Sequence, residues 1–218
     1  MAKILFMKYD FRKMKLLYLA SIVLFAPLGY VMAYSTENIL SAYSYMLLIS
    51  TIVPTSLFTY EQRADYGFDL MLPAKEGDRI AGRYLISAVT ITYEFLLGTV
   101  IAFILTKTTQ AVWFDISVIF KFFVGGILIC MSIELCILYI IGRGINPQVR
   151  SVMIMLPNMI IWGIAYAATN IFSDKLSSAK GIFSNFEMLG NIVLIVSLIF
   201  YIASMYVSTY IVKKKDFR

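Results

Sequence analysis

Six long apolar stretches divide this chain, and they constrain its fold more than any other feature. They cover residues 16–34, 39–60, 84–105, 114–141, 152–172 and 189–212. A helix needs about 20 predominantly apolar residues to cross the hydrocarbon core of a bilayer. Because 60% of the 218 residues are hydrophobic and only 15% are charged, little polar sequence remains for a soluble domain. We therefore expect a single all-α, polytopic membrane domain over residues 1–218, with six transmembrane helices.

The basic residues are distributed unevenly around these stretches. Fifteen of the 19 lie before the first stretch, between the second and third, between the fourth and fifth, or after the sixth. The other four are Lys107, Lys121, Lys175 and Lys180. Cytoplasmic loops collect lysine and arginine, so the pattern predicts a multi-pass protein of the cell membrane with both termini in the cytoplasm. The net charge of +6 then reports orientation and not a nucleic-acid partner.

Residues 1–15 are typical of a short amphipathic helix on a membrane surface. Apolar residues recur at helical spacing, and basic residues lie towards the other face: Ile4, Met7, Phe11 and Met14 against Lys8, Arg12 and Lys13. Such a helix lies along the inner leaflet, where Lys8, Phe11, Arg12 and Lys13 would contact the surface. A positive anchor that only sets the topology is the alternative, and both interpretations can hold together.

The longest cytoplasmic segment, residues 61–83, combines acidic with apolar residues. Acids recur every four residues at Glu61, Asp65 and Asp69, which places them on one face of a short helix. Pro73 ends that helix and precedes another that leads into the third span. Exposed apolar and acidic residues favour a docking surface for a cytosolic partner, formed by Glu61, Asp65, Tyr66, Phe68, Asp69, Leu72 and Pro73. An ordinary solvated loop is the competing interpretation.

Two acids lie well inside the predicted spans, Glu94 in the third and Glu134 in the fourth. A charge at membrane depth is costly, by about 3 kcal/mol or more, and is a functional hypothesis by default. Three roles remain open for these acids. They line a translocation path and attract a cationic part of a substrate, they are protonated and hydrogen-bonded between helices, or they relay protons in a secondary transporter.

Catalytic and metal chemistry find little support in the composition. The chain has no histidine, which removes the commonest general base and metal ligand. Its two cysteines, Cys130 and Cys136, lie on opposite sides of one helix and are expected to be free. The segment 142–147 lacks the G-x-x-x-x-G-K-[ST] spacing that cradles phosphates. We expect no catalytic residue, no metal site and no ATPase activity in this chain.

Residues 54–84 resemble the permease subunits of ATP-binding-cassette (ABC) transporters of the second exporter type, known as ABC-2, in the compact six-span branch of that family. The matching elements are Tyr60, Glu61, Tyr66, the pair Leu72-Pro73, Arg79 and the pair Arg83-Tyr84. The chain departs from the pattern at Gln62, where the family usually has a second acid. The basic amphipathic amino terminus, the six spans and the cytoplasmic termini extend the likeness to the whole chain.

The resemblance implies a coupling helix in residues 61–83 that sits in a cleft of a separate cytosolic ATPase, and an elbow helix in residues 1–15. Two ATPase copies, which bind ATP and Mg²⁺, would serve two permeases, either identical or paralogous, in the lipid bilayer. This chain itself would bind no cofactor.

As the permease of an ATP-driven exporter, the chain would move a hydrophobic or amphipathic substrate out of the cell. Its spans carry few charges that recognise a hydrophilic solute, and the resembling branch recurrently exports amphipathic or antimicrobial peptides. The alternatives are an ion-coupled secondary transporter that uses Glu94 and Glu134, and a membrane scaffold without transport activity.

Overall fold

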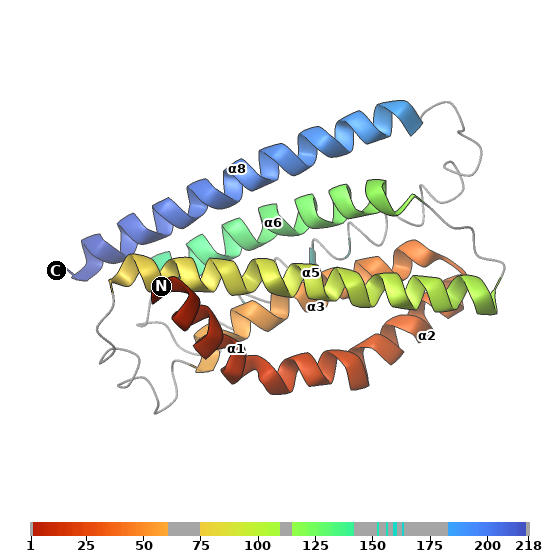
Figure 1. Cartoon of the computed structure of the whole chain (residues 1–218), viewed down its shortest axis with the longest axis horizontal. Coiled ribbons are helices and arrows are strands. Elements are labelled where there is room, and N and C mark those ends of the chain that lie inside the picture. Colours follow the sequence, from red (N-terminus) through yellow and green to blue (C-terminus); the bar gives the residue numbers. More distant parts are fainter. Residues whose placement is uncertain are drawn as a thin grey trace.

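The computed structural model describes residues 2–60, 75–109, 115–141 and 183–216, together with positions 152, 156, 159, 160 and 163. In chain order its elements are α1 (Ala2–Ala20), the π-helix η1 (Ser21–Phe25), α2 (Ala26–Thr36), α3 (Ile39–Tyr60), α5 (Glu76–Thr108), α6 (Ile116–Ile141) and α8 (Phe183–Asp216). Every regular element in this part of the chain is helical, so the expected all-α fold is confirmed. Figure 1 shows both chain ends at the same end of the helical bundle.

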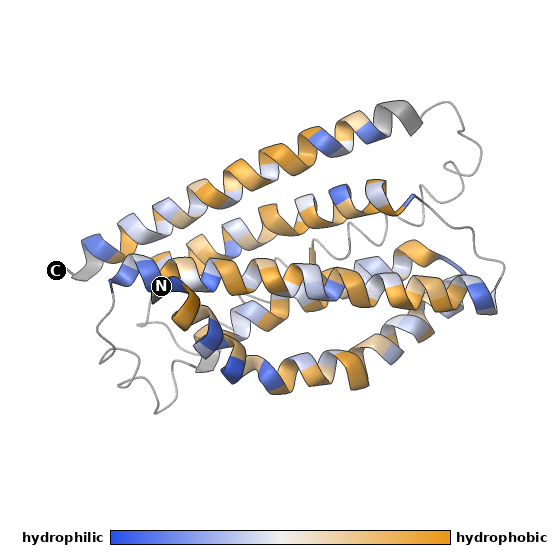
Figure 2. Ribbon diagram, in the orientation of Figure 1, coloured by the Kyte–Doolittle hydropathy of each residue, from blue (hydrophilic) through white to orange (hydrophobic). Residues whose placement is uncertain are grey.

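Five of the helical stretches are long and apolar enough to cross a membrane. They are Lys3–Thr36, Ile39–Phe58, Glu76–Thr108, Ile116–Ile141 and Glu187–Lys214. Hydrophobic residues cover the middle of these helices, and hydrophilic residues gather towards their ends (Figure 2). The predicted multi-pass architecture is confirmed for these five stretches. The span expected at 152–172 lies largely outside the described residues and stays a prediction.

The first two spans form a tight antiparallel hairpin, as the short link at residues 35–38 predicts. Helix α2 ends at Thr36, and Glu37 follows in the left-handed conformation with φ of 49°. The Asn38 side chain then caps α3, because its Oδ1 accepts a hydrogen bond of 3.0 Å from the backbone N–H of Leu40. Two polar residues thus reverse the chain at the end of the bundle opposite the termini.

Helix α3 is the central element of the described bundle. In its apolar window 72% of the residues are buried, against 22% in the first and the last candidate spans. Several of its serine and threonine hydroxyls donate to its own backbone: Ser50 donates to the carbonyl of Leu47 at 2.7 Å, and Thr55 to that of Thr51 at 2.8 Å. Local bonding of this kind allows serine and threonine to be buried without partners on other helices.

Helix α5 carries the third span and begins closer to the amino terminus than the apolar stretch suggests. Lys75 precedes it in an extended conformation, and Glu76 and Asp78 occupy its first turn, where acids complement the helix dipole. The helix expected after Pro73 is therefore continuous with the span. Arg83, which the sequence places at the end of the segment that leads into the third span, lies in α5 and is buried, with 4% of its surface exposed.

The direction of α6 and α8 bears on the span that lies outside the described residues. Lys121 contacts Glu187 near the start of both helices, and Cys136 contacts Ser204 about four turns later. The two helices are therefore parallel and pack side by side. A parallel pair needs a connection that returns to the end where both helices start, and the predicted span at 152–172 would supply that return.

Candidate functional site

The residues expected to dock an ATPase, Glu61, Asp65, Tyr66, Phe68, Asp69, Leu72 and Pro73, lie outside the described residues. The structure does describe the helices on either side of them. Helix α3 ends at Tyr60 and α5 begins at Glu76, at the end of the bundle that holds both termini (Figure 1). The docking role of this segment stays a prediction.

The amino-terminal segment is helical, as its sequence predicts, and its place on a membrane surface stays a prediction. Lys8, Phe11 and Arg12 are exposed, and the Nζ of Lys13 lies 4.4 Å from the centre of the Tyr9 ring. The structure shows no break at residue 15, however, because the helix continues to Ala20 and leads directly into the first span. The expected elbow and the first span are one helical stretch, whose amino-terminal part runs obliquely to α5 (Figure 1).

Glu94 lies at the centre of a polar contact between the first span and α5. Its side chain is fully buried, and its Oε1 accepts a hydrogen bond of 2.7 Å from the Ser21 hydroxyl. Its Oε2 is also buried and has no hydrogen-bond partner among the described residues. In this conformation the carboxyl group packs between helices, which is one of the three roles that its sequence position left open.

Ser21 occupies the first position of the π-helix η1, which interrupts the first span. The backbone N–H of Ala26 bonds to the carbonyl of Ser21, a step of five residues instead of four. Pro27, at the start of α2, has no N–H to donate, and the π-turn accommodates that loss. The first span is thus irregular just before Pro27, and Ser21 lies opposite Glu94. Short π-helical segments occur frequently at functional sites.

Further polar contacts join the same two stretches on either side of Glu94. The hydroxyls of Tyr18 and Thr90 lie 2.6 Å apart, and the hydroxyl of Tyr93 donates to the carbonyl of Tyr18 at 3.0 Å. Near the other end, the hydroxyls of Tyr30 and Thr108 lie 3.1 Å apart. We call the contacts Asp10–Arg83, Tyr18–Thr90, Ser21–Glu94 and Tyr30–Thr108 the polar seam.

The sequence analysis singled out Glu94 and, through the family resemblance, Arg83, and it missed the other members of the seam. A usable signal was present, because Tyr18 and Ser21 on one stretch, and Thr90 and Glu94 on the other, recur at helical spacing of three or four residues. What the sequence did not show is that these two polar faces meet.

The seam includes a buried ion pair at the end of the bundle that holds the termini. The Nε of Arg83 lies 3.8 Å from Oδ2 of Asp10, and the guanidinium carbon lies 4.5 Å from the centre of the Phe58 ring. Asp10 and Arg83 are 5% and 4% exposed. One residue earlier, Gly82 allows α1 to cross α5 closely, since a Cβ there would lie 2.8 Å from the Cβ of Phe6.

A second polar cluster connects α5 with α8. Ser204 donates to the Tyr84 hydroxyl at 3.1 Å, and the hydroxyls of Tyr84 and Ser208 lie 2.9 Å apart. Tyr201 donates to the backbone carbonyl of Tyr84 at 2.7 Å. The Sγ of Cys136 on α6 lies 3.4 Å from the carbonyl of Ser204, so this cluster ties three helices together.

Glu134, the second acid at membrane depth, is 3% exposed and lies on α6, so it is not part of the seam. Cys130 is buried one turn earlier, and both it and Cys136 are free thiols, as expected. Among the described residues, no hydrogen bond joins Glu94 to Glu134. Their expected place in a translocation path stays a prediction.

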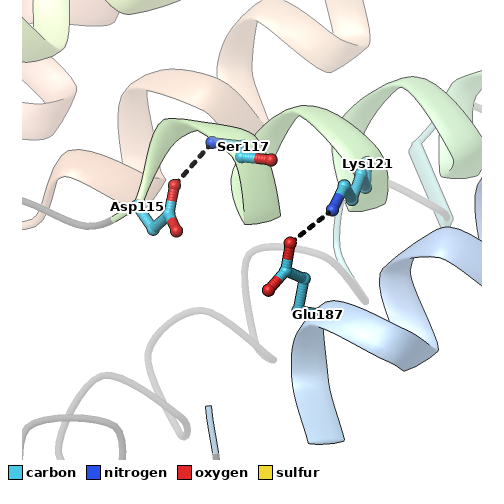
Figure 3. A network of polar contacts seen from close by, with 4 residues as sticks. All are labelled: Asp115, Ser117, Lys121 and Glu187. Carbon is cyan, nitrogen blue, oxygen red and sulfur yellow. Dashed lines mark hydrogen bonds and ion pairs between the residues drawn. The ribbon is translucent and has the colours of Figure 1, made fainter. Parts of the chain in front are cut away.

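An exposed ion pair joins the amino-terminal ends of α6 and α8, at the end of the bundle opposite the chain termini. Figure 3 shows Lys121 reaching from α6 to Glu187 on α8, with 3.3 Å between Nζ and Oε1. Asp115 caps the start of α6 in the same view, because its Oδ1 accepts a hydrogen bond of 2.8 Å from the backbone N–H of Ser117. The stem of Lys121 passes over Gly190, where a Cβ would lie 3.2 Å from the Cβ of Lys121.

A family model described as ABC-2 family transporter protein matches residues 5–213 of this sequence. The chain belongs to the ABC-2 transporter family. This match confirms the resemblance to the ABC-2 family, whereas the compact six-span branch stays a prediction. It identifies the chain as a transmembrane permease of an ABC exporter, which is a transport component of the membrane and not a catalytic one. Comparison with curated protein sequences and with solved structures finds no match to either.

Proposed function

We propose that this ABC-2 permease exports a hydrophobic or amphipathic substrate from the cell and is powered by a separate cytosolic ATPase that docks at residues 61–75. The observation that carries the proposal is the continuity of α5, which runs without a break from Glu76 to Thr108. A displacement imposed on the docking segment therefore reaches a helix that spans the whole bundle. A rigid helix transmits such a displacement, whereas a flexible linker would absorb it.

The proposed assembly contains two permease chains, identical or paralogous, and two ATPase copies that bind ATP and Mg²⁺. The termini, the ends of α3 and α5 at the docking segment, and the basic face of α1 lie at one end of the bundle. We assign this end to the cytoplasm because it carries most of the basic residues. The exposed residues Lys8, Phe11 and Arg12, with Lys13, then lie along the inner leaflet.

The substrate that we propose to test first is a cationic amphipathic peptide. The exposed faces of the described spans are apolar and suit one face of an amphipathic helix, as at Leu96, Val100 and Phe103 on α5. The two acids at membrane depth, Glu94 and Glu134, would favour positive charge over negative charge along the path.

The docking segment provides the direct test of this function. Reversal of charge in Glu61→Arg, or deletion of residues 61–72, is expected to reduce the ABC ATPase that co-purifies with the tagged chain by about tenfold, which is 1.4 kcal/mol of binding free energy. Western blotting and ATP hydrolysis by the purified complex measure the loss. Lys107→Glu, a reversal at the opposite end of the bundle, is the matched control and should retain the partner. Equal recovery of the ATPase in all variants would contradict the proposal.

Glu94 provides a test of the substrate class. Gln still accepts a hydrogen bond from Ser21, so Glu94→Gln should leave the fold intact while it removes the negative charge. We expect ATP-driven transport of a cationic peptide into inverted vesicles to fall about tenfold, with transport of a neutral analogue unchanged. If both substrates are unaffected, Glu94 is a packing residue only. Transport that needs a proton gradient and no ATP would favour the secondary transporter.

A further inference from the structure

We propose that the first helical stretch, α1–η1–α2, and α5 move as one body during transport, and that Asp10 and Arg83 are the positioning residues that join them at the end where the ATPase docks. The inference rests on the proposed function, because it concerns how movement of the docking segment is distributed among the helices. Beyond the proposed function, the inference states that movement of the docking segment displaces the first and third spans together.

The register of the polar seam is the first argument. Three of its four contacts pair residues that are 72 or 73 positions apart, namely Tyr18 with Thr90, Ser21 with Glu94, and Asp10 with Arg83, whereas Tyr30 and Thr108 are 78 positions apart. The near-constant separation indicates that residues 10–21 and 83–94 run in the same direction and keep one register along this part of the bundle. Sliding of one helix along the other would break these contacts together, and three of the four are partly or fully buried.

The second argument is the burial of the ion pair. Asp10 and Arg83 are both almost fully enclosed, so separating them would leave two buried charges that no longer neutralise each other. Removal of one member of a buried ion pair is strongly destabilising for this reason. The face of the Arg83 guanidinium also lies on the Phe58 ring of α3, which attaches the same residue to the second span.

The third argument is the close crossing of α1 and α5 at Gly82. A Cβ at this position would lie 3.1 Å from the carbonyl oxygen of Lys3 and 3.3 Å from the backbone nitrogen of Met7, in addition to its contact with Phe6. The two backbones therefore approach each other directly, without an intervening side chain. We call this direct backbone contact between α1 and α5 at Gly82 the joint. It fixes the distance between the two helices more narrowly than contacts between flexible side chains do.

The position of this joint along the chain gives it a mechanical role. Helix α5 begins at Glu76, and Arg83 follows two turns later, about 10 Å along the axis at 1.5 Å per residue. Movement of the docking segment therefore reaches Gly82 and Arg83 before it reaches the middle of the span. Through Asp10 and Phe6 it reaches α1 at the same level, so the first span follows the third.

Charge reversal tests the positioning role in the reconstituted permease–ATPase complex. The variants are Asp10→Arg, Arg83→Asp and the double variant that exchanges the two charges. Peptide transported per ATP hydrolysed should fall about tenfold in each single variant and recover to within about threefold of the wild type in the double variant. The amount of ATPase bound should not change. Single variants with an unchanged ratio, or a double variant no better than the singles, would overturn the inference.

A matched pair of glycine variants tests the joint without a change of charge. Gly82→Ala places a methyl group against the backbone of α1, whereas Gly126→Ala on α6 meets no described atom within 4 Å. The transport-to-hydrolysis ratio should fall at least threefold in Gly82→Ala and stay at the wild-type value in Gly126→Ala. Equal ratios in the two variants would count against the joint.

A distance measurement tests the single body independently of transport. Spin labels at the exposed positions Leu16 and Leu96 report on α1 and α5, and a label at Ile199 reports on α8. In the permease alone, the Leu16–Leu96 pair should give one narrow distance distribution, and it should keep that distance when the ATPase and a non-hydrolysable nucleotide are added. A broad distribution, or a nucleotide-dependent shift of this pair, overturns the inference. If the wild-type chain binds no ATPase, the proposed function fails, and the distribution in the permease alone still decides whether the two helices form one body.

Discussion

Replacement of Tyr84 by alanine is expected to lower the free energy of unfolding by about 3–5 kcal/mol, the cost typical of removing a large buried aromatic side chain. Tyr84 is 2% exposed, and its ring lies 5.0 Å from that of Tyr201. Its hydroxyl also accepts the hydrogen bond from Ser204. The substitution therefore leaves a cavity and removes the group that connects α5 with α8. Unfolding in detergent, followed by circular dichroism, measures the change.

Two companion substitutions separate the ring from the hydroxyl. Tyr84→Phe keeps the ring and should cost about 1–2 kcal/mol, because only the hydrogen bonds to Ser204 and Ser208 are lost. Tyr206→Ala removes a tyrosine from α8 that is 68% exposed, and it should change the unfolding free energy by less than about 0.5 kcal/mol. A similar loss for Tyr84→Ala and Tyr206→Ala would show that α5 and α8 do not pack as described.

Replacement of Gly125 by leucine should disrupt the packing of α6 against α8. A Cβ at Gly125 would lie 2.9 Å from Cγ1 of Val193 and 3.5 Å from its backbone carbonyl carbon, so any side chain forces the two helices apart. Overpacking of this kind costs about 1–3 kcal/mol, and more where backbone atoms must move. We expect a lower yield of monodisperse protein in detergent and a reduced apparent melting temperature.

The neighbouring Gly126 supplies the control for this prediction. It lies in the same helix with the same apolar flanks, is partly exposed, and would present a Cβ to no described atom within 4 Å. Gly126→Leu should leave the melting temperature at or slightly above that of the wild type, since leucine has a better helix propensity than glycine by roughly 1 kcal/mol. If both variants melt alike, the direction in which α6 faces α8 has been assigned incorrectly.

These two glycines show the kind of detail that the sequence left open. The spacing of Gly126 and Cys130 is that of residues which permit close helix approach, yet the structure uses Gly125 for the approach and leaves Gly126 partly exposed. Adjacent positions on a helix point about 100° apart. Which of them faces a neighbour depends on the rotation of α6 about its own axis, and sequence spacing alone carries no information on that rotation.

Arg83 illustrates the same limit for charge. The positive-inside pattern counts Arg83 among the basic residues between two spans and carries no information on its partners. The structure buries Arg83 in α5 and pairs it with Asp10, from a segment more than 70 residues earlier. Neither residue signals the other in the sequence, because both lie among other charged residues on segments rich in lysine and arginine.

The chain's composition and the periodic recurrence of its apolar stretches by themselves determined that this protein is an all-helical membrane protein, because about 20 apolar residues in succession have no stable place in water. The segment around Leu72-Pro73 determined the family. The tertiary structure alone decided that Ser21 meets Glu94, that Gly82 meets Phe6 and that Asp10 meets Arg83. Hydrophobicity drives helices into the bilayer without specifying their partners, whereas short-range packing and hydrogen bonds, which act only over a few ångströms, select which faces come together.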